Sequence, residues 1–148
     1  MSVKLVVMPN KLLKYIQLDP GNDLPDISDL RPFKAIVVIE DEVPQIWQWE
    51  VSRWLVQSGC SYMMAWGKEC GSWEESVDEA NQEAFNYEDV PPEQVVMTTC
   101  HEDEELSEVF WFAKHRAFHP SNDLGNTVIL HISGEAKKDD LQSLYEQA

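Results

Sequence analysis

The sequence predicts an α/β fold in three layers, with a four-stranded, mainly parallel sheet between two layers of helices. Two observations predict it. From residue 34 onward, short apolar runs rich in β-branched residues alternate with longer amphipathic stretches. Each amphipathic stretch is also long enough to form the helical crossover between parallel strands. We expect the four strands, numbered along the chain, to lie in the order 2-1-3-4, so that the first and third strands are neighbours.

The first predicted strand and helix occupy residues 34–59. KAIVVIE at 34–40 is a continuous apolar run, as expected for a strand that is covered on both faces. The helix that follows has Pro44 at its first position and ends at Gly59. Its expected core-facing side chains repeat with helical spacing, and they are Trp47, Val51, Trp54 and Leu55.

The second strand and helix follow the same pattern. SYMMAWG at 61–67 predicts a strand that stops at Gly67. Ser72 and Glu75 have the spacing of a capping box, which predicts the start of the second helix. The helical face that follows is formed by Trp73, Val77, Ala80 and Ala84.

The last two strand–helix pairs complete the alternation. QVVMTT at 94–99 predicts the third strand, and the apolar spacing after Leu106 predicts a helix that ends before Pro120. NTVILHIS at 126–133 predicts the fourth strand, in which His131 is expected to be a hydrogen-bonded core residue. Residues 137–147 have enough apolar positions for a terminal helix.

The N-terminal part of the chain differs from this repeat. Residues 1–33 are expected to form an extension, in which KLVVMP and KYIQL either pair as a hairpin around Asn10 or supply one edge strand. Residues 19–32 contain three prolines and four aspartates and are expected to be a loop. We therefore predict a single domain over residues 1–148, with the repeating core at 34–148.

Charge is the strongest global signal in the composition. The formal net charge is −16, and residues 40–108 account for all of it, with 18 acidic and two basic side chains. A surface of this sign repels phosphate groups, so direct nucleic-acid binding and attachment to anionic lipid are not expected. No apolar stretch is long enough to span a bilayer and no signal peptide is evident at the N-terminus, so a cytoplasmic location is expected.

The three cysteines indicate neither a disulfide framework nor a structural zinc site, because their number is odd and no paired spacing occurs. Cys100 is next to His101, near the predicted start of a helix, which favours a thiolate. The neighbouring carboxylates act in the opposite direction, so a buried and unreactive cysteine is the better interpretation. No cofactor is therefore expected in the main interpretation.

Two acidic segments follow predicted strands, and they are the main candidates for a functional site. Glu40, Asp41 and Glu42 end the first strand, and Glu102, Asp103, Glu104 and Glu105 follow the third. If these strands are neighbours, the two segments share one rim at the carboxyl edge of the sheet. The carboxylates could stabilise helix N-termini, hold Mg²⁺ through Glu40, Asp41, Glu102 and Asp103, or bind a basic protein partner.

One segment resembles a known family. AIVVIEDEVPQIWQWEVSRWLVQSG is similar to the opening strand, acidic pair and first helix of bacterial response-regulator receiver domains. In that family the acidic pair binds Mg²⁺, and Glu40 with Asp41 or Glu42 would match it. The third strand of a receiver ends in a phospho-accepting aspartate, whereas here it ends in MTTC and the next aspartate is Asp103. The resemblance therefore implies the topology and not phosphotransfer.

The tryptophans supply a second signal for a binding surface. Trp49 and Trp111 fall outside the predicted core stripes, and exposed aromatic residues beside charged groups are typical of protein-binding hot spots. Toxin-neutralising immunity proteins and regulatory inhibitors share this profile of small size, acidity and many aromatics. We therefore expect a non-catalytic module that binds a basic protein. The alternatives are a divalent-metal-dependent enzyme or receiver-like switch, and a mimic of DNA. The expected partner-binding residues are Glu40, Asp41, Glu42, Trp49, Glu102, Asp103, Glu104, Glu105 and Trp111.

Overall fold

The computed structural model describes residues 12–148 and contains five strands and four α-helices within that range. Two short 3-10 helices, Ser28–Leu30 and Pro92–Gln94, lie in the connections. The strands are β1 Leu13–Leu18, β2 Phe33–Ile39, β3 Cys60–Gly67, β4 Met97–Cys100 and β5 Asn126–Ile132, and the helices are α1 Gln45–Gln57, α2 Cys70–Glu83, α3 Leu106–His115 and α4 Lys138–Gln147.

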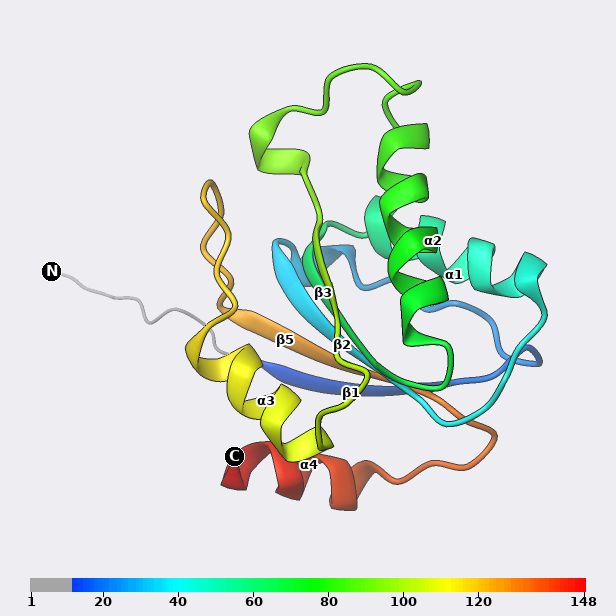
Figure 1. Ribbon diagram of the computed structural model, residues 1–148, viewed down its shortest axis with the longest axis vertical. Coiled ribbons are helices and arrows are strands. Elements are labelled where there is room, and N and C mark those ends of the chain that lie inside the picture. Colours follow the sequence, from blue (N-terminus) through cyan, green and yellow to red (C-terminus); the bar gives the residue numbers. More distant parts are fainter. Residues whose placement is uncertain (1–11) are drawn as a thin grey trace, which may run out of the picture.

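The five strands form one parallel sheet in the order β1-β5-β2-β3-β4 (Figure 1). The α/β class with a parallel sheet is therefore confirmed, whereas the expected four strands in the order 2-1-3-4 are wrong. The first and third predicted strands, β2 and β4, are separated by β3. The receiver-like order implied by the resemblance is also not found.

The helical connections explain the observed order. α1 and α2 each carry the chain one strand further along the same face of the sheet, from β2 to β3 and then to β4. α3 lies on the opposite face and returns the chain past β3 and β2, so that β5 pairs with the free side of β2. Because the crossovers between parallel strands are right-handed, helices on one face of the sheet lead to new strands in one direction across it. Helices on the other face lead to new strands in the opposite direction.

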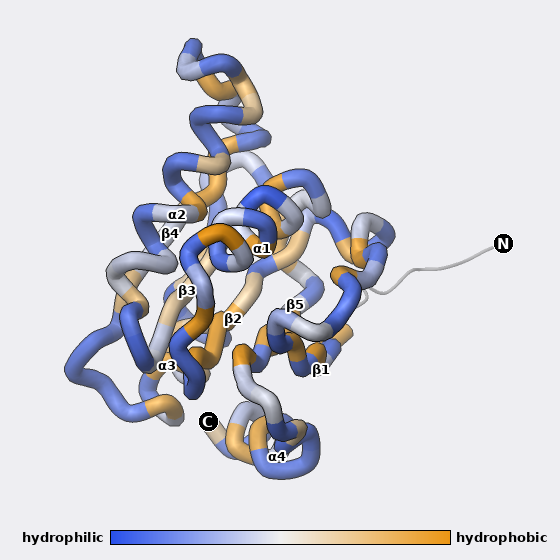
Figure 2. The backbone as a smooth tube through the Cα atoms, turned by 90° about the vertical axis from the view of Figure 1, so that its right-hand side faces the viewer, coloured by the Kyte–Doolittle hydropathy of each residue, from blue (hydrophilic) through white to orange (hydrophobic). Residues whose placement is uncertain are grey.

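Hydrophobic residues fill both interfaces between the sheet and the helices. Phe33, Ala35, Val37 and Ile39 of β2 face α1 and α2, whereas alternate residues of that strand face α3 and α4. All seven residues of β2 are buried, as its continuous apolar sequence predicts. Figure 2 shows apolar residues along the central strands and hydrophilic residues along much of α2.

The N-terminal extension supplies an edge strand. β1 pairs with β5 in parallel, from Leu13 opposite Thr127 to Leu18 opposite Ile132. This is the edge-strand alternative for the KYIQL segment. The hairpin alternative falls partly outside the described residues. Within residues 12–148, no helix combines the length and apolar composition needed to cross a membrane.

Helix α2 begins earlier than the sequence predicts. Its first residue is Cys70, and the residue before it, Glu69, has a left-handed backbone with φ of 52°. Ser72 is therefore already inside the first turn, and its hydroxyl contacts Gln48 of α1 and does not cap the helix. The predicted capping box at Ser72 is wrong, and the capping box of the fold is formed instead by Glu105 and Glu108 at the start of α3.

Candidate functional site

The parallel sheet brings the carboxyl ends of all five strands to one edge, and the connections reverse direction between β2 and β5. β2 leads into α1 on one face, and β5 leads into α4 on the other. Such a switch point is where open α/β sheets usually bind ligands. The backbone N–H groups of Glu40 and Asp41 both donate to the carbonyl oxygen of Ile132, at 3.0 and 3.2 Å. This contact fixes the first acidic segment beside the end of β5.

Glu40 ends a chain of hydrogen bonds that joins four elements of the fold. Its Oε1 lies 2.6 Å from Nε2 of His131, and His131 Nδ1 lies 2.6 Å from the hydroxyl of Tyr15. The backbone N–H of Lys137 donates to that hydroxyl at 2.9 Å, and Lys137 Nζ lies 3.3 Å from Glu40 Oε2. His131 is fully buried, so its expected role as a hydrogen-bonded core histidine matches the structure.

Within this chain of hydrogen bonds, the pKa of Glu40 is lowered and the pKa of Tyr15 is raised. Desolvation by burial acts to raise the pKa of Glu40, but the bonds from His131 and Lys137 together bring it below its usual value. Burial raises the pKa of Tyr15, and the charge of Glu40 adds to that rise against the bond from the Lys137 backbone. Glu40 is therefore a carboxylate at neutral pH, and Tyr15 is a neutral phenol whose hydroxyl shares a hydrogen bond with His131.

A second histidine is held in a similar way after β4. His101 is buried, and its ring nitrogens lie 2.8 Å from the hydroxyl of Thr99 and 2.7 Å from Oε2 of Glu104. Its ring also packs edge-on against Phe112, with the centroids 5.0 Å apart. The indole N–H of Trp66 donates to the carbonyl oxygen of Glu104 at 2.7 Å. These bonds fix the start of the second acidic segment.

The two acidic segments border one shallow depression although their strands are not neighbours. The depression, about 500 Å³ in volume, is lined by Ile39, Glu40, Trp66, Gly67, Lys68, Glu102 and Glu104. We call it the rim depression. Gly67, the last residue of β3, lies close to β2 here, and a Cβ at that position would collide with the carbonyl oxygen of Ile39.

The other predicted rim residues have separate positions. Asp41 accepts a hydrogen bond from the backbone N–H of Gly134 at 2.8 Å, and Glu105 caps α3. Glu42 and Asp103 are exposed to solvent. The expectation that adjoining strands bring the two segments together is wrong, because β3 intervenes; their shared position at the carboxyl edge comes from the parallel sheet itself.

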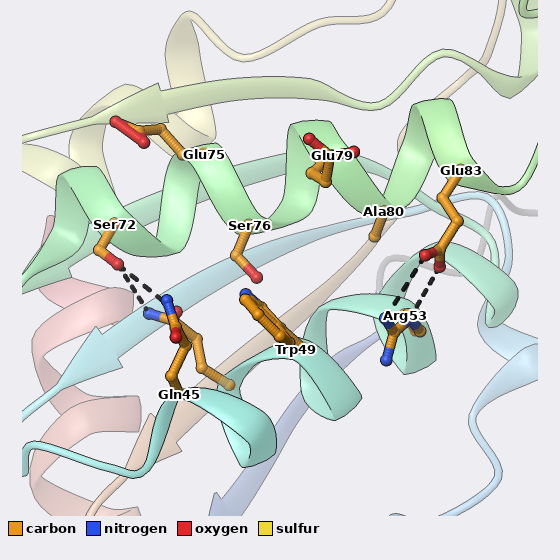
Figure 3. Close-up of a pocket in the computed structure, with 10 residues that line it drawn as sticks. Gln45, Trp49, Arg53, Ser72, Glu75, Ser76, Glu79, Ala80 and Glu83 are labelled. Atoms are coloured by element: carbon orange, nitrogen blue, oxygen red, sulfur yellow. Dashed lines mark hydrogen bonds and ion pairs between the residues drawn. The ribbon is translucent and has the colours of Figure 1, made fainter. Parts of the chain in front are cut away.

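A second concave site lies between α1 and α2 and contains Trp49 (Figure 3). We call it the helix groove; it has a volume of about 420 Å³. Trp49 extends from α1 toward α2, and 43% of its surface is exposed. The α2 wall carries Glu75, Glu79 and Glu83, which share one face because they are spaced four residues apart. The groove is lined by Gln45, Gln48, Trp49, Arg53, Ser72, Glu75, Ser76, Glu79, Ala80 and Glu83.

Polar contacts join α1 to α2 along the helix groove and at one of its ends. The hydroxyls of Ser52 and Ser76 are both buried and lie 2.7 Å apart. At one end, Arg53 Nε lies 2.7 Å from Oε1 of Glu83, and this bond holds the pKa of Glu83 below its usual value. Glu83 is therefore paired with Arg53, and Glu79 accepts a hydrogen bond from the hydroxyl of Tyr87, whereas Glu75 is exposed on the same wall.

Comparison with known proteins gives one match. Residues 13–148 match a family described as Domain of unknown function (DUF7684). The chain belongs to the DUF7684 family. No curated protein and no solved structure matches it. For this DUF7684 chain, a function is therefore inferred from the geometry of its sites.

Trp111 of the DUF7684 chain is exposed to a similar degree, at 44%, but on the other side of the sheet. Its ring packs at a tilt of 42° against His115, with centroids 4.9 Å apart, and Arg116 lies 4.9 Å from the ring centre. Because α1 and α3 cover opposite faces, one flat partner surface does not contact both Trp49 and Trp111. The role of Trp111 in partner binding stays a prediction.

Sequence reasoning missed one close group of reactive side chains. Sγ of Cys70 lies 2.7 Å from Sγ of Cys100, and a carboxylate oxygen of Glu102 is near both sulfurs. In the described part of the chain, these three residues form the group whose potential metal-ligand atoms lie within 4.8 Å of one another. The predicted ligands Glu40, Asp41 and Asp103 are not part of it. The pairing of Cys70 with Cys100 could have been predicted only if the sequence had indicated that α2 begins at Cys70 and not at Ser72.

Proposed function

We propose that the chain is a non-catalytic module that binds a basic segment of a partner protein, and that the helix groove receives it. The observation that supports this most is the position of Trp49, which lies half-exposed in a concave site whose other wall carries Glu75 and Glu79. A Lys or Arg side chain over the indole face would gain a cation–π contact and would meet a carboxylate at the same time.

The distribution of charge supports the same proposal. The segment 40–108, which carries the entire net charge of −16, contains both walls of the groove. A field of this strength raises the association rate of a positively charged partner and is weakened by salt. Exposed carboxylates contribute little individually, so the affinity would depend mainly on the aromatic anchor, and the carboxylates would set the sign of the partner.

The direct test is calorimetric titration with a defined basic probe, octa-arginine. We expect Trp49→Ala to weaken binding about fivefold or more, as loss of about 1 kcal/mol implies. Trp111→Ala is the matched control, because Trp111 is equally exposed on the other face. If both substitutions weaken binding equally, or if neither does, the groove is not the binding site.

Charge needs a control of its own, because any acidic protein attracts oligo-arginine. The double variant Glu75→Gln, Glu79→Gln should weaken binding and reduce its salt dependence. The double variant Glu42→Gln, Asp103→Asn has the same net charge but alters exposed carboxylates of the two acidic segments outside the groove. An equal effect of the two pairs would show unspecific attraction and would contradict the proposal.

The rim depression favours a second candidate, a divalent-metal-dependent activity. The observation in its favour is that Glu40, Glu102 and Glu104 line one depression at the carboxyl edge of the sheet. Millimolar Mg²⁺ should then raise the melting temperature above that in NaCl of equal ionic strength, and Glu102→Gln should abolish the difference. The absence of any Mg²⁺-specific shift would reject this candidate.

A further inference from the structure

Cys70 and Cys100 are 30 residues apart in sequence, and the fold brings their sulfurs to 2.7 Å. Cys70 is the first residue of α2, and Cys100 is the last residue of β4. Both positions are set by regular structure, because β4 pairs with β3 up to Cys100 and α2 follows β3 after two turn residues. The third cysteine, Cys60, is buried at the other end of β3.

We propose that Cys70 and Cys100 are a thiol pair that forms a reversible disulfide. A disulfide bond is about 2.05 Å long, so the two sulfurs need to move together by well under 1 Å. Cys100 is partly exposed, whereas Cys70 is 1% exposed. An oxidant therefore reaches Cys100 first, and Cys70 is placed to complete the reaction.

The oxidant belongs to the class of small-molecule disulfides. The Cys100 thiol loses its proton and the thiolate attacks one sulfur of the oxidant, which breaks the S–S bond and releases one small thiol. The Cys70 thiol then loses its proton and attacks the sulfur of Cys100, which releases the second small thiol. The protein gives up two electrons and two protons in total, and the oxidant is reduced to two thiols.

The surroundings of the pair determine which oxidants react quickly. Burial, together with the neighbouring Cys70, Glu102 and Glu74, raises the pKa of Cys100 to about 12. The thiolate is therefore scarce at neutral pH, and the local field is negative. A positively charged disulfide such as cystamine should react faster than the negatively charged oxidised glutathione, because the field concentrates cations and repels anions.

The bond would restrict the second acidic segment, which follows β4. It would tie the start of α2 to the residue that precedes His101 and Glu102, and it would close a loop that contains α2 and β4. We expect the melting temperature of the oxidised chain to rise by roughly 5–10 °C over the reduced chain, since a loop of this length restricts the unfolded state.

The test counts free thiols by mass after incubation with cystamine, denaturation and alkylation. The reduced chain should take up three alkyl groups, and the oxidised chain should take up one, on Cys60. A digest without reductant should contain the peptide of Cys70 linked to the peptide of Cys100. Cys60→Ser is the matched control, and it should still lose two alkylation sites on oxidation.

The dependence on charge supplies a second readout that a structural cysteine pair would not give. Glu102→Gln should speed oxidation by oxidised glutathione about fivefold, the factor that corresponds to one unit charge about 4 Å away in water. The rate with cystamine should not rise by as much. Both measurements use the folded chain with its cysteines intact.

Three outcomes would overturn the proposal. The first is three alkylated cysteines after prolonged incubation with cystamine. The second is a stable mixed disulfide on Cys100 that Cys70 does not displace. The third is a pair that resists oxidation but gives thiolate-to-metal absorption when the reduced chain is titrated with Cd²⁺, which would make Cys70, Cys100 and Glu102 a metal site.

Discussion

Gly67 lines the rim depression at a position that requires glycine. Its φ of 106° lies in the region that favours glycine, and a Cβ there would collide with the backbone of Ile39. The sequence indicated that a strand stops at this glycine, and β3 does end there. It did not indicate the close approach to β2, because that contact joins residues far apart in the chain.

Replacing Gly67 with alanine should therefore lower the free energy of unfolding by at least about 2 kcal/mol, since both the left-handed backbone and the collision cost energy. Chemical denaturation measures this. Gly21→Ala is a suitable control, because Gly21 has a negative φ and the nearest atom to its new Cβ would be a side-chain oxygen. Equal stability of Gly67→Ala and the unchanged chain would contradict the backbone argument.

At the scale of elements, the hydrogen-bond chain of Tyr15, His131 and Glu40 joins β1, β5 and the end of β2 to the residue before α4. The alternation of β5 predicted a bonded core histidine. Neither of its partners could be predicted, because the position of β5 between β1 and β2 is a property of the whole topology. The same reason explains why the strand order was wrong although most strand positions were right.

The lowered pKa of Glu40 gives this chain of bonds a pH dependence. A carboxylate whose pKa is lower in the folded state adds stability above its unfolded pKa, and this stability is lost as the pH falls through the folded pKa. Glu40→Gln should therefore lower the free energy of unfolding by about 1 kcal/mol at pH 7. The difference from the unchanged chain should shrink below the ordinary glutamate pKa of 4.5.

Denaturation curves at pH 7 and at acidic pH would measure this difference. Glu42→Gln is the control, because Glu42 is exposed and follows the same strand. A Glu40→Gln effect of the same size at both pH values would mean that the carboxylate charge has no part in the stabilisation.

At the scale of the whole molecule, the net charge of −16 has consequences beyond any single contact. The composition predicted a strongly negative protein, and the structure places carboxylates of this charge both in the helix groove and at the carboxyl edge of the sheet. Only the α1 side of the groove could be predicted. Trp49 was recognisable as a surface residue because it is outside the core stripe, whereas the packing of α1 on α2 places Glu75 and Glu79 in the same groove.

Self-repulsion should make the stability of the chain depend on salt. Raising NaCl from about 10 mM to about 150 mM shortens the Debye length from roughly 30 Å to roughly 8 Å. We expect the melting temperature at pH 7 to rise by about 2–4 °C, which corresponds to about 1 kcal/mol for a chain of this size. KCl at the same ionic strength should give the same rise, and a melting temperature that falls or stays constant would contradict the repulsion argument.

The pairing of β1 with β5 has a consequence for the order of events during synthesis. The strand at Leu13–Leu18 leaves the ribosome before the other strands of the sheet, but its neighbour, Asn126–Ile132, is made more than 100 residues later. β5 also separates β1 from β2, so neither strand gains its final neighbour on that side until β5 has emerged. The nascent protein must therefore carry an apolar strand without its native partner while the intervening strands and helices are made, and completion of the sheet is a non-local and correspondingly slow step.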